Sequence, residues 1–561
     1  MAFMKNKSKS HNKSKSLLHN LLRLNFGGII FGLAFFCLSL LPSLLPRPWL
    51  YQGLISGASV AIGYSLGTAF SWLFRWLTEY EFPKDVKQFA WKVLLVTGPI
   101  SVIVYLYLGA IWQNNVRNLV GESSIDGRHM IRIALLSILV FFLILLIARG
   151  IRIFTAYLIK QLDKIMPRRL SNTIGLLAII ALFTWLASGV FYTNFVDQAN
   201  KIYSAKNKTT PAGVSQPTSP YRSGSKESLI AWGTLGYQGQ NFVAKGPNQQ
   251  QLEQFTGSKP KEQIRIYSGL NSASTASQRA NLAVQELKRT GAFERKILIV
   301  ATATGTGWLE PQSVDSIEYM YGGDSAIVSQ QYSYLPSWIS FLVDSDNATQ
   351  AGQELYNAVY SEWSNLPIDK RPKLIAYGLS LGSFGGQSAF SGISDLRNSI
   401  DGALFMGTPS TTQLWRNVTE NRDAGSPEWQ PTYEQGNAVR FAATNENINS
   451  NQSNWKFPRV LYMQHASDPV VWFNFDLIFN KPDWLNEKRG PDVSPTMRWY
   501  PFVTFLQVTV DQFFGVNVPN GHGHNYPNTI VSAWGSVIPP TNWNTQQANQ
   551  LQNIINTYSN E

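Results

Sequence analysis

Ser380 stands at the centre of a Gly-x-Ser-x-Gly motif in the sequence KLIAYGLSLGSFGG. Residues 373–377 read as a buried strand, and residues 383–390 are compatible with a helix. A strand–turn–helix context exposes such a serine as a nucleophile, and only glycine fits on either side of the tight turn. We expect the Leu381 N–H and the start of the helix to stabilise negative charge on a reacting carbonyl oxygen.

A serine nucleophile of this kind needs an acid and then a histidine base, in that chain order. After residue 200 the only histidines are His465, His522 and His524. His465 precedes the expected acid, whereas the other two lie in the loop NGHGHNYP, just ahead of a helical pattern over 528–534. We favour His522 as the base, because it follows Gly521 and lies farther from the helix, and keep His524 as the alternative.

Asp468 is the predicted acid of the triad. It stands just beyond a strand pattern over 459–464, at the edge where active-site groups of open α/β sheets gather. There it would orient the imidazole and stabilise its charged form. Two alternatives remain: Asp468 forms only a turn before Pro469, or Asp511 is the acid.

A second oxyanion donor is expected from the segment ERKILIVATATGTGWLEP. It contains an apolar strand pattern over 297–301 and then a glycine-rich loop. Backbone N–H groups of Thr306, Gly307 and Trp308 are the candidates, because the second donor of such sites comes from a loop after an early strand. The alternative is an ordinary glycine turn.

We expect no metal and no cofactor. Cys37 is the only cysteine and lies in an apolar run, which excludes a disulfide or a cysteine-based metal site within the chain. A zinc site from His522, His524 and a carboxylate is disfavoured, because Gly-His-Gly-His in a loop is a poor preformed ligand set.

The 561 residues divide into two parts of different composition. Residues 1–200 carry 20 of the 47 Lys and Arg residues but only 7 of the 35 Asp and Glu residues, so the net charge of +12 originates there. This charge flanks apolar segments instead of clustering on a soluble face, which indicates membrane topology and argues against nucleic-acid binding.

Five apolar stretches follow one another, each near the ~20 residues that a membrane-spanning helix needs. They cover residues 25–45, 53–77, 91–112, 131–149 and 172–195. The Lys and Arg residues before the stretches, between them and at their ends number 6, 1, 4, 3 and 6 for the successive loops, an alternation that the positive-inside rule associates with a cytoplasmic N-terminus. We therefore expect five crossings of the inner membrane and an extracytoplasmic C-terminal domain.

The expected organisation is a basic cytoplasmic tail (1–24), a transmembrane helical domain (25–196), a linker (197–225) and an α/β domain (226–561). In the last domain, short apolar strands alternate with helical patterns. The aromatic segment between the acid and the histidines is interpreted as a cap, as a surface that dips toward lipid, or as additional core.

An ordered series of segments runs through the chain: SLIAWGTLGYQGQNFV, IRIYSGLNSA, LAVQELKRTGAFERKILIV, TGTGW, QYSYLPSWISFLVD, YGLSLGS, LFMGTPS and GHGHNY. This series resembles the bacterial membrane-anchored α/β-hydrolases, which combine a multi-helix N-terminal domain with an α/β-hydrolase domain. Gly233 departs from the pattern, since an acidic residue is expected there, which leaves the triad untouched. The resemblance implies hydrolase chemistry in the cell envelope.

These features predict a serine esterase or lipase that acts on acyl esters of envelope lipids or acylated glycans through an acyl-enzyme. An acyltransferase with the same triad is the first alternative. A transporter or scaffold with a non-catalytic hydrolase-like domain is the second, and the scarcity of charges inside the apolar stretches disfavours it. The lipid bilayer and the acyl ester are the expected partners, and the sequence identifies no protein partner.

Overall fold

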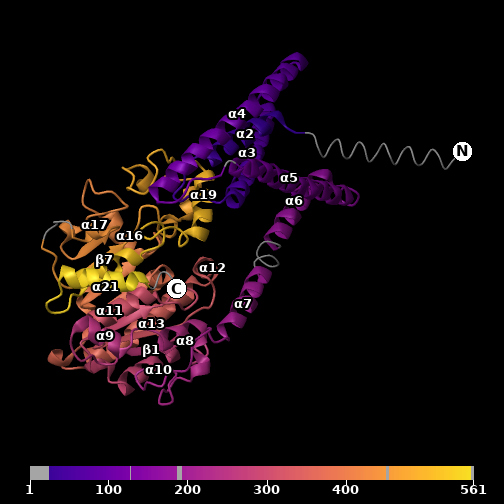
Figure 1. The fold of residues 1–561 in the computed structure, drawn as a ribbon. Helices are drawn as coiled ribbons and strands as arrows, with labels where there is room; N and C mark the ends of the chain where they lie inside the picture. Colours follow the sequence, from indigo (N-terminus) through magenta and orange to yellow (C-terminus); the bar gives the residue numbers. More distant parts are fainter. Residues whose placement is uncertain (1–23, 127, 186–192, 450–453, 558–561) are drawn as a thin grey trace. The chain divides into compact units, whose positions relative to one another are not determined.

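The chain folds into two compact units. The computed structural model describes residues 24–126, 128–185, 193–449 and 454–557 (Figure 1). The first unit, called here the helical unit, contains the N-terminal part up to Asn194 together with Phe475–Lys481 and Ser494–Asp511. The second, called here the α/β unit, takes the other residues from Phe195 onward and is built on a parallel sheet.

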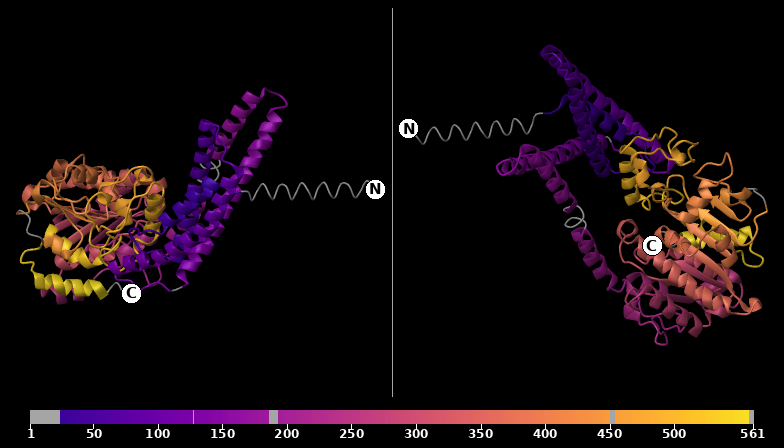
Figure 2. Two further views of the ribbon diagram at one scale, coloured as in Figure 1. Left: turned by 90° about the horizontal axis from the view of Figure 1, so that it is seen from above. Right: turned by 180° about the vertical axis from the view of Figure 1, so that it is seen from behind.

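Three helices of the helical unit are long and apolar enough to span a membrane, by length and composition, among the residues that the structure describes. Figure 2 shows the helices from two further sides. The expectation of five spanning helices is therefore met only in part. The three are α3 (Trp49–Thr78), α4 (Lys84–Leu119) and α5 (His129–Leu162), accompanied by α2 (Phe26–Ser39) and α6 (Arg168–Trp185).

The first and fifth expected spans differ from the others for physical reasons. Helix α2 ends at Ser39, because Pro42 cannot continue a helix and restricts the residue before it. Its 14 residues extend about 21 Å, which is shorter than the ~30 Å hydrocarbon core. Helix α6 begins with Arg168 and Arg169, which lower its mean hydropathy, and the rest of the stretch 172–195 lies partly outside the described residues.

Close packing of α2 against α3 explains the glycines in the second apolar stretch. A Cβ atom on Gly67 would lie 2.3 Å from the carbonyl oxygen of Gly27, and one on Gly63 would lie 2.6 Å from that of Phe31. Small residues of this kind let two helix backbones approach each other in a membrane protein. Over an 18-residue window, the mean hydropathy of α3 is 1.3, below the 2.0 of α4 and the 3.0 of α5, and these packing glycines account for part of the difference.

Part of the aromatic segment belongs to the helical unit. Helix α19 (Val503–Asp511) ends in a buried carboxylate, which lies 3.4 Å from Nε of Arg47. The hydroxyl of Ser43 also donates to Asp511, and Gln507 donates to backbone carbonyls at the end of α2. Asp511, the alternative candidate for the acid of the triad, is thus enclosed by the connection between α2 and α3. Its described partners lie there and not in the loop that carries His522 and His524.

The α/β unit contains a seven-stranded sheet in which all neighbouring strands are parallel. Strands β1, β2, β3 and β5 are buried along their whole length, as expected when helices cover both faces. The three strands predicted from the sequence are confirmed. The order across the sheet is β1 (Ile264–Ser268), β3 (Ser325–Gln330), β2 (Ile297–Thr302), β4 (Lys373–Leu379), β5 (Gly402–Met406), β7 (Arg459–Met463) and β6 (Val439–Ala442).

Two groups of helices pack against this sheet (Figure 1). The first group is α10 (Ala276–Arg289), α13 (Ser345–Ser364) and α14 (Leu381–Gln387). The second is α11 (Pro311–Met320) and α20 (Ile530–Val537), and α21 (Thr545–Thr557) packs on these two helices. The remaining α-helices of the unit are α7 (Thr193–Asn207), α8 (Gly236–Ala244), α9 (Gln249–Thr256), α12 (Ser337–Val343), α15 (Ile393–Ser399), α16 (Gln413–Glu420), α17 (Asn445–Asn449) and α18 (Pro469–Trp472).

The segment expected to be a linker over 197–225 begins as a helix. Helix α7 continues to Asn207, and the irregular chain after it reaches the sheet, where Arg222 forms an isolated parallel bridge with Arg265. The Asn207 side chain accepts a hydrogen bond from Nε2 of Gln331 at 3.0 Å. This segment is therefore tied to the rest of the α/β unit at Asn207 and at Arg222.

The strand order places the candidate residues at one edge of the sheet. Strand β2 pairs with β3 on one side and with β4 on the other, so the chain leaves β2 and β4 at a reversal of the strand order. In open α/β sheets, ligands bind beyond the carboxyl ends of strands at such a point. Ser380 follows β4, the loop Thr304–Trp308 follows β2, and Asp468 follows β7.

Candidate active site

Ser380 occupies a strained turn between β4 and α14. Its φ is 57° and its ψ is −126°, a conformation that a non-glycine residue adopts only under constraint. A Cβ atom on Gly378 would lie 2.5 Å from the carbonyl oxygen of Gly382, and one on Gly382 would lie 2.2 Å from that of Thr302. Both glycines of the motif are therefore required by the backbone around the serine.

His524 and Asp468 form a buried pair. The Nδ1 of His524 lies 2.7 Å from Oδ2 of Asp468, and the carboxylate has no exposed surface. The other oxygen, Oδ1, accepts the Val470 N–H at 2.8 Å and so caps helix α18. Asp468 thus orients the imidazole and also forms the turn before Pro469, which combines the two interpretations offered by the sequence.

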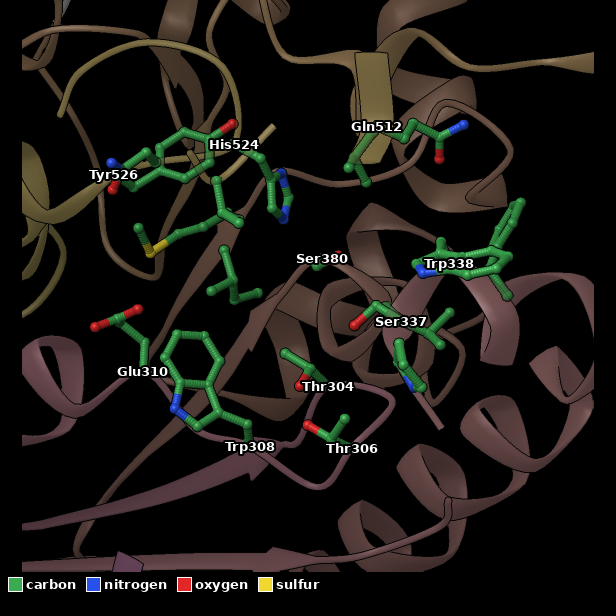
Figure 3. A pocket seen from close by; sticks show the side chains of 18 of the residues that line it. Thr304, Thr306, Trp308, Glu310, Ser337, Trp338, Ser380, Gln512, His524 and Tyr526 are labelled. Carbon is green, nitrogen blue, oxygen red and sulfur yellow. The ribbon is translucent and has the colours of Figure 1, made fainter. Parts of the chain in front are cut away.

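The Nε2 atom of His524 faces the same cavity as Ser380. This nitrogen is buried and has no hydrogen-bond partner among the described residues. Figure 3 shows the ring of His524 directed toward Ser380. Gly407 makes room for the ring, because a Cβ atom there would lie 2.3 Å from its Cε1. The arrangement leaves Nε2 available to take a proton from a nearby hydroxyl, the task of a general base.

His522, which the sequence favoured as the base, points elsewhere. Its Nδ1 lies 3.5 Å from Oδ2 of Asp492, and it does not line the cavity that holds Ser380. Gly521 and Gly523 both have positive φ, at 91° and 54°, so the backbone turns sharply between the two histidines. The preference for His522 followed from the spacing, and it is His524 that the fold brings against Asp468.

His465 packs against the loop Gly521–Tyr526, which carries the other two candidate histidines and is called here the histidine loop. Its ring is buried, lies 2.8 Å through Nδ1 from the Gly523 carbonyl and stacks on Tyr526 with ring centroids 4.3 Å apart. Burial lowers the pKa of His465, which favours its neutral form. Ser467 accepts the Gly523 N–H at 2.8 Å and donates to Asp492. These contacts hold the loop in one conformation.

A cavity of about 540 Å³ surrounds Ser380 and His524 (Figure 3). Its walls are mainly apolar, with aromatic residues from several loops of the α/β unit. Such cavities, with a few polar groups in an apolar lining, are typical of small-molecule sites. The apolar and aromatic lining residues include Trp308, Trp338, Phe341, Met406, Phe473 and Phe513.

The predicted oxyanion donors are only partly available. Thr306 and Trp308 line the cavity, as does Leu381 at the start of α14. The Gly307 N–H instead donates to the Thr304 carbonyl at 2.8 Å, and the Thr304 N–H donates to the Trp308 carbonyl at 3.0 Å. Gly307, with a φ of 85°, therefore closes the turn and is not itself a free donor.

Comparison with known protein families decides where the chain belongs. Residues 264–551 match the model of an alpha/beta-hydrolase family, and residues 40–247 match the model of that family's N-terminus. The chain belongs to this α/β-hydrolase family. No curated protein matches the chain.

Three residues of the hydrolase domain were missed by the sequence reasoning. The Tyr526 hydroxyl donates to Oδ2 of Asp468 at 2.5 Å, and burial together with the negative charge of Asp468 raises the pKa of this tyrosine well above its usual value. Asp492 pairs with His522, and Glu310 lines the cavity. Tyr526 stands two residues after His524, but no pattern in the sequence distinguishes it from a core tyrosine.

Proposed function

We propose that the protein is a membrane-anchored serine hydrolase that cleaves acyl esters of envelope lipids or acylated glycans. One observation carries the proposal. Ser380, at positive φ, lines the same cavity as Nε2 of His524, and His524 is paired with the buried Asp468. Backbone strain of this kind is retained where it serves function. Membership of the hydrolase family supports the same chemistry.

In the proposed reaction, Oγ of Ser380 attacks the acyl carbonyl while its proton passes to Nε2 of His524. Asp468 stabilises the imidazolium through Nδ1, and the N–H of Leu381, aided by the loop at Thr306 and Trp308, stabilises the oxyanion. The C–O bond to the alcohol then breaks, and His524 gives its proton to the departing alcohol oxygen. Water, deprotonated by His524, attacks the acyl-enzyme and releases the carboxylic acid and free Ser380.

We further propose that the hydrolase domain lies on the extracytoplasmic side of the inner membrane. The support is the alternation of positive charge along the N-terminal part, with the basic tail in the cytoplasm. Three spans (α3 to α5) and five spans (with α2 and α6) are both odd numbers, so either count gives the same side. A reporter fused after Asn207 that proved to be cytoplasmic would overturn this topology.

An acyltransferase would use the same residues and differ only in the acceptor, an alcohol in place of water. Hydrolysis, with water as the acceptor, is proposed as the default reaction. A transporter or scaffold with an inactive domain gives no reason for the strain at Ser380 or for the unpaired Nε2 of His524.

The decisive experiment is labelling of the full-length protein in detergent with a fluorophosphonate probe, which reacts with activated serines. The wild-type protein and the Ser388→Ala variant, altered near the end of α14, are expected to be labelled. The Ser380→Ala variant is expected to lose labelling completely while keeping its thermal unfolding temperature. Labelling of Ser380→Ala at the wild-type rate would refute the assignment of the nucleophile.

A further inference from the structure

The cavity has two sides of different chemistry, one on each side of Ser380. Figure 3 shows Glu310 and Trp308 on one side, together with Tyr526, and Trp338 with Gln512 on the other. On the Trp338 side, the ring of Phe513 packs edge-on against Trp338, and Phe513 and Val516, which both line the cavity, are 41% and 61% exposed. Apolar side chains that reach the surface beside the polar Gln512 suit an acyl chain.

Glu310 is the polar feature of the opposite side. It is the one carboxylic acid among the described residues that line the cavity, and none of those residues is Lys or Arg. Its Oε1 accepts the Gln312 N–H at 3.3 Å, and no other hydrogen bond to this carboxyl is found within the described part of the chain. A carboxyl group without a cation, in an apolar cavity, has a strong need for a hydrogen-bond partner.

The protonation of Glu310 suits a neutral partner. Burial raises the pKa of Glu310 to about 7, the Gln312 N–H opposes this, and the charge of Asp315 adds to it. Near neutral pH the carboxyl can therefore donate as well as accept a hydrogen bond, as a hydroxyl group also does. Trp308 lies beside it, between Glu310 and Thr304 in Figure 3, and offers an apolar ring face.

The chemistry of the two sides suggests which half of the ester meets Glu310. In the proposed reaction His524 protonates the departing alcohol, so the alcohol oxygen lies next to Nε2. The residues that follow His524, including Tyr526, Pro527 and Ile530, line the cavity together with Glu310. We place the alcohol half of the ester along these residues, where its hydroxyl groups can meet the carboxyl group, and the acyl half on the Trp338 side.

We propose that Trp308 and Glu310 form a subsite for a polyhydroxylated alcohol, so that the substrate is the acyl ester of a polyol or sugar and not of a simple alcohol. In this subsite a hydroxyl group next to the ester oxygen hydrogen-bonds to Glu310, and the carbon skeleton of the polyol packs on the Trp308 ring. A site built to bind a hydroxyl group discriminates strongly against an analogue that lacks it. The inference rests on the proposed esterase function and specifies its substrate class.

The test compares two esters with the same acyl group, 1-butyrylglycerol and ethyl butyrate. Both give the same acyl-enzyme on Ser380, so a difference between them arises only from the departing alcohol. We expect Glu310→Ala to lower kcat/KM for 1-butyrylglycerol by about 10- to 100-fold, the size of one lost hydrogen bond to a carboxyl group. For ethyl butyrate we expect a change of less than about threefold.

The ratio of the two rates makes the test independent of folding. Glu310 also caps helix α11, so Glu310→Ala can reduce the folded fraction, but both esters then lose activity in equal proportion. Glu310→Gln keeps an acceptor for the cap and for the hydroxyl, and it should restore most of the ratio. Phe513→Ala, on the other side of the cavity, should leave this ratio unchanged and reduce the preference for ethyl octanoate over ethyl butyrate.

The outcomes separate this inference from the proposed function. If Glu310→Ala lowers both activities equally, or neither, the polyol subsite is wrong while the esterase stands. If the wild-type protein hydrolyses neither ester, or if Ser380→Ala keeps both activities, the proposed function is wrong. The proposed polyol subsite is then wrong as well.

Discussion

The two histidines of the loop Gly521–Tyr526 each face an aspartate, yet the two pairs differ in almost every physical respect. His524 and Asp468 are 2.7 Å apart, their side chains are 7% and 0% exposed, and the free Nε2 faces a cavity. His522 and Asp492 are 3.5 Å apart, and His522 is 28% exposed and lines no part of that cavity. A histidine and an acid in proximity are thus not enough, and the direction of the second ring nitrogen decides which pair can do chemistry.

The largest contrast is expected when each histidine is removed. His524→Ala should lower kcat for a short acyl ester by about 10⁴- to 10⁶-fold, because no other group can take the proton from Ser380. His522→Ala should lower it by less than about tenfold, because this ring acts only through the loop. Steady-state hydrolysis of an activated ester by both variants, each checked for its unfolding temperature, measures the difference. Equal losses in the two variants would remove the distinction between the pairs.

A contrast of about the same kind is expected between the two aspartates. Asp468→Asn keeps the size of the side chain but favours the wrong tautomer of His524, which should lower kcat by about 10⁴-fold. The Asp492→Asn variant should keep kcat within about tenfold of the wild-type value. Ester hydrolysis at saturating substrate provides the measurement, and a fully active Asp468→Asn variant would contradict the role of this carboxylate.

The elements around Ser380 could be predicted from the sequence, because their signals are local. An apolar run ending in Gly-x-Ser-x-Gly specifies both β4 and the turn, and a strand followed by an acid placed Asp468 at the edge of the sheet. The topology of the membrane part was predicted less completely. Apolar composition indicated α3, α4 and α5 but gave α2 a length that Pro42 does not allow.

The choice between His522 and His524 could not be read from the sequence. It depends on the positive φ values of Gly521 and Gly523 and on contacts from His465 and Ser467, which precede this loop by more than 50 residues. Glu310 was missed for the same reason. In the sequence, Glu310 resembles any residue that caps a helix after a loop. Only the folded chain shows that it lines the cavity.

The next largest effect concerns stability, and it is expected at the His522–Asp492 pair. Burial alone would raise the pKa of Asp492, but the nearby imidazole of His522 and the hydrogen bond from the Ser467 hydroxyl outweigh it and lower this pKa. A carboxyl whose pKa is lower in the folded protein adds stability above its unfolded pKa, and the gain disappears as the pH falls through the folded value.

Asp492→Asn should therefore destabilise the protein by about 1–3 kcal/mol at pH 7, and the difference should shrink as the pH falls through the pKa that Asp492 has in the folded protein. Chemical denaturation at pH 7, 5 and 3 measures this change. The matched control is Asp483→Asn, whose carboxylate is 63% exposed beside Arg422 and should contribute less than about 1 kcal/mol at any pH. A constant difference from pH 7 to pH 3 would show that Asp492 does not act through its charge.

The smallest effect is expected from the Tyr526 hydroxyl, which is the hydroxyl donor to Asp468 as the Ser467 hydroxyl is to Asp492. It donates to Oδ2 of Asp468 at 2.5 Å, on the same oxygen that faces His524, and so withdraws negative charge from the contact with the imidazole. Tyr526→Phe returns that charge to the pair, which strengthens the hold on the imidazole proton. The expected result is a loss of about 3- to 10-fold in kcat/KM at pH 7, with the acidic limb of its pH profile moved to higher pH by up to about one unit.

The matched control is Tyr321→Phe, which removes a hydroxyl that donates to the Ile538 carbonyl away from the cavity. This variant should leave the acidic limb in place. If kcat/KM of Tyr526→Phe instead falls by the same factor at every pH, Tyr526 only packs against His465 and does not act on the charge of Asp468.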